Sequence, residues 1–275
     1  MVRRARLHHP ARPDDRPRRT RRRAHVLRSA LPRGPLPRRA RAPQPDRPRR
    51  RDRRSLPPDH RIISPQLVDA NRELHEYLVN GISIEYARPD GTIGYDPVRL
   101  VDYDDPDNND WLVVNQFTFT ENGHTRRPDL VVFVNGLPVA VIELKNAASE
   151  STTIWSAYAQ LETYKAQLPA LFVFNELLVV SDGADARVGT LSSNKERFLP
   201  WRTIEGEALA PASISRLEVL LRGAFDRRRF LDLVRYFVVF EHDGQSNTKK
   251  VAGYHQFHAV ANAVDATVRA AQAHG

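Results

Sequence analysis

Two carboxylates and one lysine within a short stretch are the residues best suited to chemistry. Asp129, Glu143 and Lys145 border or interrupt two apolar runs, Leu130–Val134 and Val139–Leu144. A charged side chain at the end of a buried strand costs free energy unless it is paired or bound to a metal. Carboxylate oxygens suit Mg²⁺, which keeps several waters and also binds phosphate oxygens. The pattern therefore predicts either a local salt bridge or a metal site that acts on a phosphate ester.

A β-hairpin is expected to position these charges. The two apolar runs flank Asn135-Gly136, which is the strongest local signal for a hairpin turn. Because the runs are apolar at nearly every position, we expect strands that are buried on both faces of a sheet. Glu143 and Lys145 are two residues apart, so they project from the same face of their strand.

The register of this hairpin decides whether the carboxylates can share a metal ion. A regular two-residue turn pairs Val134 with Leu137 and places Asp129 opposite Ile142, which sends Glu143 to the other face of the sheet. One extra residue, in a three-residue loop or a β-bulge, would restore a common face. A shared metal site therefore predicts such an irregularity.

The order of Asp, hairpin and Glu-x-Lys resembles the PD-(D/E)xK nuclease core. The segment RRPDLVVFVNGLPVAVIELKNAAS, residues 126–149, is similar to the nuclease domain at the N-terminus of the R (restriction) subunit of type I restriction–modification enzymes. The resemblance implies that Asp129 and Glu143 are Mg²⁺ ligands. It also implies that Lys145 orients the attacking water and stabilises charge that develops on the phosphate in the transition state.

Further residues could support this site. Gln160 and Tyr164 lie four apart on one face of a helix expected over 154–168, and by themselves are typical of a polar surface with a packed aromatic. In the resembled subunits a Q-x-x-x-Y element follows the lysine on the next helix, where QLETY stands here, and supports the site and its DNA. Glu73 or Glu76, on a preceding helix, could add a third acidic residue, and the sequence leaves that choice open.

The remaining pattern predicts an α/β fold with a restriction-endonuclease-like mixed central sheet flanked by helices. Helices are expected where caps and apolar periodicity coincide, and strands where apolar runs lie between turn residues. Before the hairpin these are a helix from Ser64-Pro65 to Gly81 and strands at 82–86, about 98–103 and 111–120. After the hairpin and the 154–168 helix, we expect strands at 171–180 and 187–191.

A second motif lies near the end of the chain. It follows expected helices at 217–224 and 230–236 and a strand at 237–241, and it precedes a helix at 260–273. The run Tyr254–Val260 resembles the start of the helicase-like motor of the same subunits, where the glutamine that matches Gln256 reads the adenine of ATP. No G-x-x-x-x-G-K-[ST] occurs in the 275 residues, so we expect a truncated motor that does not bind ATP usefully.

Composition separates the first residues from the rest. The chain has no cysteine, which excludes disulfides and thiolate metal sites. Residues 1–54 hold 21 arginines and four aspartates, a net charge of +17. Since the net charge of the whole chain is +9, residues 55–275 have a net charge of −8. Residues 1–60 are rich in Arg and Pro and are expected to be disordered. A DNA-binding arm, a targeting peptide and translation out of frame remain open, and the lysine-free composition favours the last.

These observations divide the chain into 1–60, a nuclease domain at 61–212, and a linker with the first motor elements at 213–275. The resemblance implies a metal-dependent DNA endonuclease, a fragment of a cytoplasmic restriction subunit. It would act on double-stranded DNA with specificity and methylation subunits and without a membrane. Two alternatives remain: a stand-alone nuclease of the same superfamily, against which the Tyr254–Val260 run argues, and a non-catalytic remnant.

Overall fold

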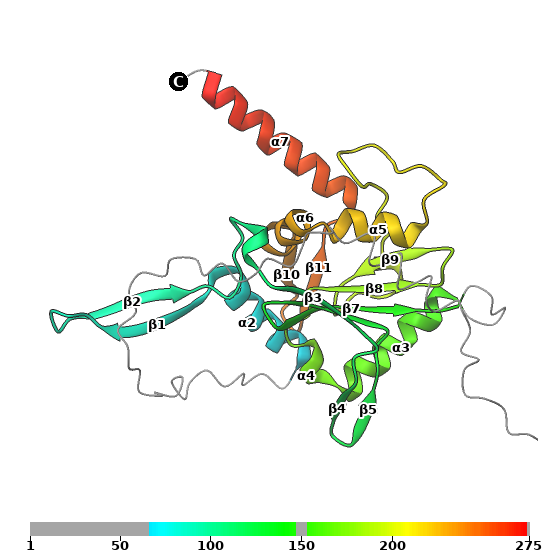
Figure 1. Cartoon of the computed structure of the whole chain (residues 1–275), viewed down its shortest axis with the longest axis horizontal. Helices are drawn as coiled ribbons and strands as arrows, with labels where there is room; N and C mark the ends of the chain where they lie inside the picture. The colour runs from blue at the N-terminus through cyan, green and yellow to red at the C-terminus, as the bar shows by residue number, and fades with distance from the viewer. Residues whose placement is uncertain (1–65, 147–152, 274–275) are drawn as a thin grey trace, which may run out of the picture.

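A five-stranded sheet forms the centre of the molecule. The computed structural model describes residues 66–146 and 153–273, so the expected disorder of residues 1–60 lies outside the described residues. The strand order is β3-β6-β7-β8-β9 (Figure 1). β7 and β8 are parallel and the other neighbours are antiparallel, which confirms the predicted mixed sheet. The strands are β3 (Trp111–Asn115), β6 (Leu130–Val134), β7 (Leu137–Leu144), β8 (Leu177–Ser181) and β9 (Ala186–Gly189).

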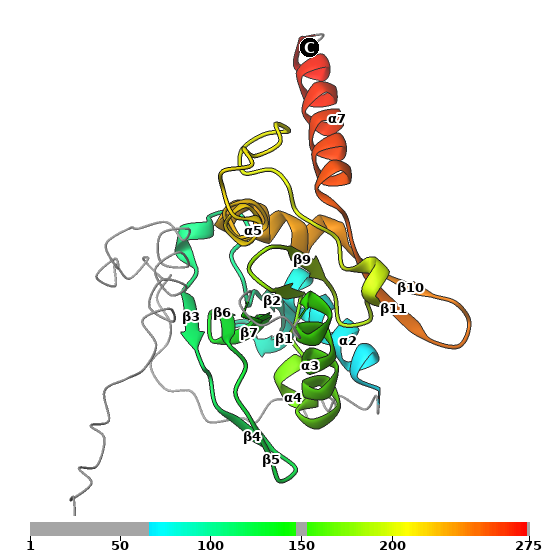
Figure 2. The same ribbon diagram turned by 90° about the vertical axis from the view of Figure 1, so that its right-hand side faces the viewer.

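Helices cover both faces of this sheet (Figures 1 and 2). Val131 and Val141 pack in the cluster formed with α3 and α4, whereas Val132 and Ile142 pack in the cluster formed with the later helices. Burial on both sides accounts for strands that are apolar at nearly every position, as predicted. One layer contains α3 (Ile154–Gln167) and α4 (Pro169–Phe172); the other contains α5 (Arg216–Ala224), α6 (Arg227–Asp232) and the π-helical turn η3 (Leu233–Phe237).

The hairpin β6–β7 combines a tight turn with a bulge. Asn135 and Gly136 both have positive φ, 51° and 84°, as a two-residue type I′ turn requires. Phe133 pairs with Pro138 but Val132 pairs with Ala140, so Val139 is an extra residue in β7. The consecutive residues Val139 and Ala140 both belong to the cluster on the α5–α6 side. The bulge therefore shifts the later residues of β7 by one position relative to β6.

A buried polar cluster joins α2 (Leu67–Asn80) to the hairpin of β10 (Val238–His242) and β11 (Asn247–Val251). The ammonium group of Lys249 donates to Asn71 Oδ1 at 2.9 Å, to the carbonyl of Asn175 at 2.7 Å and to Glu176 Oε2 at 2.8 Å. His75 Nδ1 lies 2.9 Å from the same carboxylate oxygen. Because Glu176 immediately precedes β8, this cluster ties α2 and β11 to the sheet.

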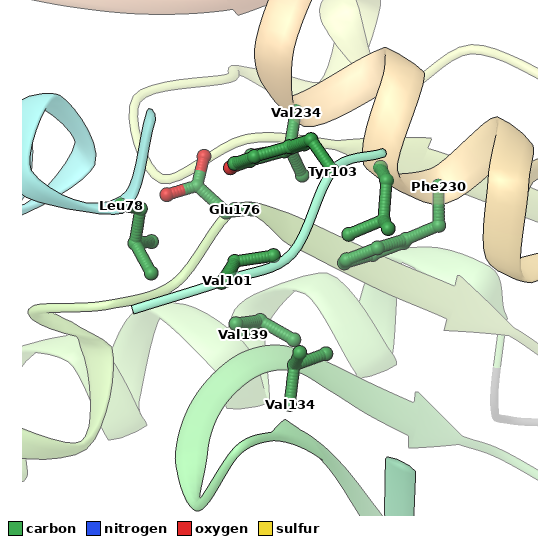
Figure 3. A pocket seen from close by; sticks show the side chains of 9 residues that line it. Leu78, Val101, Tyr103, Val134, Val139, Glu176, Phe230 and Val234 are labelled. Carbon is green, nitrogen blue, oxygen red and sulfur yellow. The ribbon is translucent and has the colours of Figure 1, made fainter. Parts of the chain in front are cut away.

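A cavity of about 10 Å³ lies beside Glu176, between the sheet and the α6–η3 layer (Figure 3). The hydroxyl of Tyr103 and Glu176 Oε1 are buried without hydrogen-bond partners among the described residues, and both side chains line this cavity. Burial raises the pKa of Tyr103, and the charge of Glu176 raises it further. This volume is close to the smallest that can hold one water molecule.

Several elements extend from the central body. The hairpin of β1 (Ile82–Ala87) and β2 (Ile93–Val98) projects from one side, and the long helix α7 (Tyr254–Ala273) projects from another (Figures 1 and 2). Within residues 66–146 and 153–273, no helix is both long and apolar enough to cross a lipid bilayer. The smaller elements are β4 (Phe119–Glu121), β5 (His124–Arg126) and the 3₁₀ turns η1 (Pro106–Asn108) and η2 (Lys195–Arg197).

The structure corrects three predicted strands. The strand expected at 98–103 is wrong because β2 ends at Val98 and Asp102 then accepts backbone N–H groups in an irregular loop. The strand expected at 111–120 is interrupted after Asn115, since Gln116 adopts a left-handed φ of 56°. The strand expected at 171–180 starts only at Leu177, because Pro169 begins the short helix α4.

The end of the chain also differs in detail from the expectation. The last helix begins at Tyr254, not at residue 260, so the Tyr254–Val260 run forms its first two turns. The polar strand β11 had no apolar alternation to reveal it. Leu220, Phe225 and Phe230 pack in the same hydrophobic cluster as the sheet residues. Helices α5 and α6 therefore share the hydrophobic core of the sheet, while the division at residues 212 and 213 stays a prediction.

Candidate nuclease site

Asp129 and Glu143 lie on the same face of the sheet. Beyond the bulge Leu130 pairs with Ile142, so the preceding residue, Asp129, lies opposite Glu143. The backbone N–H of Leu144 donates to Asp129 Oδ2 at 2.9 Å, which fixes the first carboxylate to the strand that carries the second. The irregularity that a shared metal site requires is thus present, in the form of a bulge and not of a three-residue loop.

Gln116 is a neighbour of Asp129 that the sequence did not indicate. Its backbone N–H donates to the carbonyl of Asp129 at 2.9 Å, and its side-chain Nε2 donates to Asp129 Oδ1 at 2.7 Å. Both carboxylate oxygens of Asp129 therefore accept a hydrogen bond. A glutamine at the end of an apolar strand carries no motif, so only the fold reveals this contact.

The Q-x-x-x-Y pair extends the site onto α3. Lys145 Nζ donates to Glu143 Oε1 at 3.1 Å and also to the side-chain oxygen of Gln160. The amide nitrogen of Gln160 donates in turn to the hydroxyl of Tyr164, whose side chain is only 3% exposed. A chain of contacts therefore runs from Glu143 through Lys145 and Gln160 to Tyr164, and Asp129 joins it by its bond to the backbone N–H of Leu144, next to Glu143.

The two carboxylates of the site differ in their burial and in their hydrogen-bond partners. Glu143 is 2% exposed, and burial together with the charge of Asp129 raises the pKa of its carboxyl from the ordinary 4.5 to about 7, although Lys145 opposes this. Asp129 has two donors on its oxygens, whereas Glu143 Oε2 is buried with no hydrogen-bond partner among the described residues. The site thus holds one partly exposed, hydrogen-bonded carboxylate, Asp129, and one buried carboxylate, Glu143, whose negative charge Lys145 offsets only in part.

This donor set fits a hard divalent cation. An unpaired buried carboxylate oxygen costs free energy that a cation bound there would offset. In the described part of the chain, no group of three or more His, Cys, Asp or Glu residues is placed to hold a metal. Two carboxylates are nevertheless sufficient for Mg²⁺, which fills its remaining positions with water and substrate oxygens. Asp129 and Glu143 are therefore the residues that would hold the ion.

The other sequence-predicted residues lie outside this chain of contacts. Glu73 accepts a hydrogen bond from Tyr77 at 3.0 Å, and Glu76 forms a 3.4 Å ion pair with Arg72, so both acids have partners within α2. Gln256 is exposed at the start of α7, where its Oε1 accepts the backbone N–H of Gly253 at 2.9 Å. The choice between Glu73 and Glu76, and the adenine contact of Gln256, stay predictions.

The mixed sheet, the bulged hairpin and the paired carboxylates define a nuclease-like α/β protein. Residues 49–197, more than half of the chain, match the family described as type I restriction enzyme R protein N terminus. The chain belongs to this family, which confirms the resemblance that the hairpin motif indicated.

Individual relatives agree with this assignment. Over 213 residues the chain is 40% identical to the type I restriction enzyme HindI endonuclease subunit of Haemophilus influenzae, a match that covers 76% of this chain and 20% of the relative. It is 31% identical over 227 residues to a protein from Methanocaldococcus jannaschii that carries the name of a type I restriction enzyme MjaIXP endonuclease subunit. This match covers 76% of this chain and 21% of the relative. It is 29% identical over 138 residues to the type I restriction enzyme EcoprrI endonuclease subunit of Escherichia coli. This match covers 48% of this chain and 41% of the relative. The chain thus spans about a fifth of the length of the first two relatives.

Proposed function

We propose that this chain is the DNA-cleaving part of a type I restriction subunit, a metal-dependent endonuclease that hydrolyses phosphodiester bonds in double-stranded DNA. The observation that carries the proposal is the placement of Asp129 opposite Glu143 by the Val139 bulge, with Lys145 beside them. The names of the relatives as endonuclease subunits support the same reaction class.

Each residue has a distinct role in this proposal. Asp129 and Glu143 would hold Mg²⁺, which when bound polarises the scissile phosphate and makes hydroxide available near neutral pH. Lys145 presents a positive charge beside the carboxylates, where it orients the attacking water and stabilises charge that builds up on the phosphate. Gln160 and Tyr164 hold the lysine head against the site, since Gln160 accepts from Lys145 and donates to Tyr164.

The proposal extends to partners only through the family. Because the relatives are subunits of type I restriction enzymes, we propose that specificity and methylation subunits of such a complex supply recognition. We propose that ATP is bound by the parts of the longer relatives that this chain does not match, because the 275 residues contain no phosphate loop. The expected cytoplasmic location stays a prediction.

A cleavage assay tests the reaction. Purified chain is incubated with supercoiled plasmid in Mg²⁺ and, in parallel, in EDTA, and nicked and linear products are quantified. We expect products in Mg²⁺ alone, and none from Lys145→Ala in either condition. Equal cutting in EDTA, or full activity of Lys145→Ala, contradicts the proposal. A folded wild-type chain that never cuts supports the alternative of a non-catalytic remnant.

A further inference from the structure

Gln116 occupies a backbone conformation that its residue type disfavours. Among the described residues three non-glycine residues have positive φ: Gln116 at 56°, Asn122 at 49° and Asn135 at 51°. The two asparagines precede glycines in tight hairpin turns, where the left-handed conformation is common for that residue. Gln116 lies in no such turn and has no short side chain to bond its own backbone. A glutamine in this region indicates that contacts with the rest of the fold hold its backbone there, as is common at functional sites.

The side chain of Gln116 identifies that constraint. The left-handed residue breaks the strand after Asn115 and turns the amide toward Asp129, which Nε2 reaches at 2.7 Å. Asparagine would adopt the same backbone more readily, but its side chain is one methylene shorter. Glutamine therefore suits this position because its side chain is long enough to reach the Asp129 carboxylate, and not because it favours the left-handed backbone.

The two donors on Asp129 define its orientation. Leu144 N–H, on β7, donates to Oδ2 and Gln116 Nε2, after β3, donates to Oδ1, so the carboxylate is held from the strands on both sides of β6. Hydrogen bonds to an ionised acceptor are the stronger class and limit rotation of the group. Because each carboxylate oxygen has two acceptor positions, the bond from Gln116 leaves a position open on Oδ1.

We propose that Gln116 is a positioning residue of the metal site: it holds the Asp129 carboxylate in the orientation that binds the ion together with Glu143. This inference rests on the proposed function, because it requires Asp129 to be a metal ligand. Partners that orient metal ligands are often nearly as important as the ligands, and their loss weakens metal affinity by about 10- to 100-fold. Gln116 is exposed, so its replacement leaves the hydrophobic core unchanged.

Calorimetric titration of the full chain with Mn²⁺ tests the proposal without depending on catalysis. Gln116→Met removes the donor and keeps an unbranched side chain of similar length. Gln116→Asn keeps an amide and favours the left-handed backbone but loses the reach. Gln167→Met, on α3, is the matched control, because Gln167 bonds Arg126 and neither carboxylate of the site. We expect both Gln116 variants to bind Mn²⁺ about 10- to 100-fold more weakly and the control to bind as the wild type does.

Plasmid cleavage at increasing Mg²⁺ distinguishes positioning from chemistry. We expect Gln116→Met to cut slowly at low Mg²⁺ and to approach the wild-type rate at saturation. Wild-type Mn²⁺ affinity in Gln116→Met, or in Gln116→Asn alone, overturns the inference while the proposed function stands. A cleavage defect that persists at saturating Mg²⁺ also overturns a positioning role. If the wild-type chain binds no Mn²⁺, the metal site itself and the inference both fail.

Discussion

Glu143 lies directly across the hairpin from Asp129, although the Asn135-Gly136 turn alone would have placed Ile142 there. The difference is one residue, Val139, which the bulge adds to β7. Because side chains alternate along a strand, this single insertion decides whether the two carboxylates share a face. The chemistry of the site therefore depends on a backbone irregularity next to a regular turn.

The first prediction concerns the proton on Glu143. The folded chain holds this proton up to a pH of about 7, whereas the unfolded chain releases it near 4.5. In EDTA, the contribution of Glu143 to stability is therefore most favourable below pH 4.5 and is lost as pH rises from 4.5 to 7. Glu143→Gln removes this loss, and we expect it to stabilise the metal-free chain by about 1 to 3 kcal/mol at pH 8.

Urea unfolding of wild type and Glu143→Gln at pH 5 and pH 8 measures this effect. We expect a small difference at pH 5 and the full difference at pH 8, because the wild-type carboxyl is still protonated in the folded chain at the lower pH. An equal difference at the two pH values would show that the buried charge of Glu143 is not the cause.

A second prediction concerns the support of Lys145. Gln160→Leu removes the acceptor that holds the ammonium group, while Asp129 and Glu143 keep their contacts. We expect DNA cleavage to fall by about 10- to 100-fold, as for other small displacements of catalytic groups, with Mn²⁺ affinity unchanged. Gln167→Leu, one turn beyond Tyr164 on the same helix, is the control. A loss of metal affinity in Gln160→Leu would mean that α3 supports the carboxylates and not the lysine.

The sequence predicted the hairpin well because it is encoded locally. Asn135-Gly136 specifies the turn by its need for positive φ, and buried strands require apolar residues at consecutive positions. The Q-x-x-x-Y helix followed from its spacing and from the resemblance. The sequence showed that a shared site needed an irregularity, but it could not locate the irregularity, because Val139 is an ordinary apolar residue.

Other features depend on tertiary contacts and left no local pattern. Gln116 breaks a run that otherwise reads as one strand, and it does so to reach a carboxylate 13 residues away. Lys249 lies in a polar stretch that would ordinarily face solvent, yet its side chain is fully buried against Glu176. Each position is explained by a partner that is distant in sequence, so periodicity could not reveal it.

The third prediction concerns this buried cluster. Lys249→Met leaves the Glu176 carboxylate buried without its cation, and breaking such a pair typically costs about 3 to 5 kcal/mol. The double variant Lys249→Met/Glu176→Gln removes both charges and is expected to recover most of this loss. Urea unfolding at pH 7 measures both variants. A single variant as stable as the wild type would contradict the assignment of this pair as the link between α2, β8 and β11.

The fourth prediction concerns nucleotide. The family resemblance assigns an adenine contact to Gln256, but the 275 residues contain no phosphate loop to bind the β- and γ-phosphates. We expect the chain to show no ATPase activity and only feeble ATP affinity in calorimetry. ATP binding in the micromolar range would show that the start of α7 forms a nucleotide site without that loop.

The most direct test of the central claim is the number of Mn²⁺ ions that the chain binds. If Asp129 and Glu143 share one ion, calorimetry will find one site at the carboxylates, and Asp129→Asn and Glu143→Gln will each abolish it. Lys145→Ala will retain the site but will not cut DNA, because the lysine acts on the phosphate and not on the ion. Retention of that Mn²⁺ site after loss of either carboxylate would contradict a shared metal site and, with it, this account of the nuclease centre.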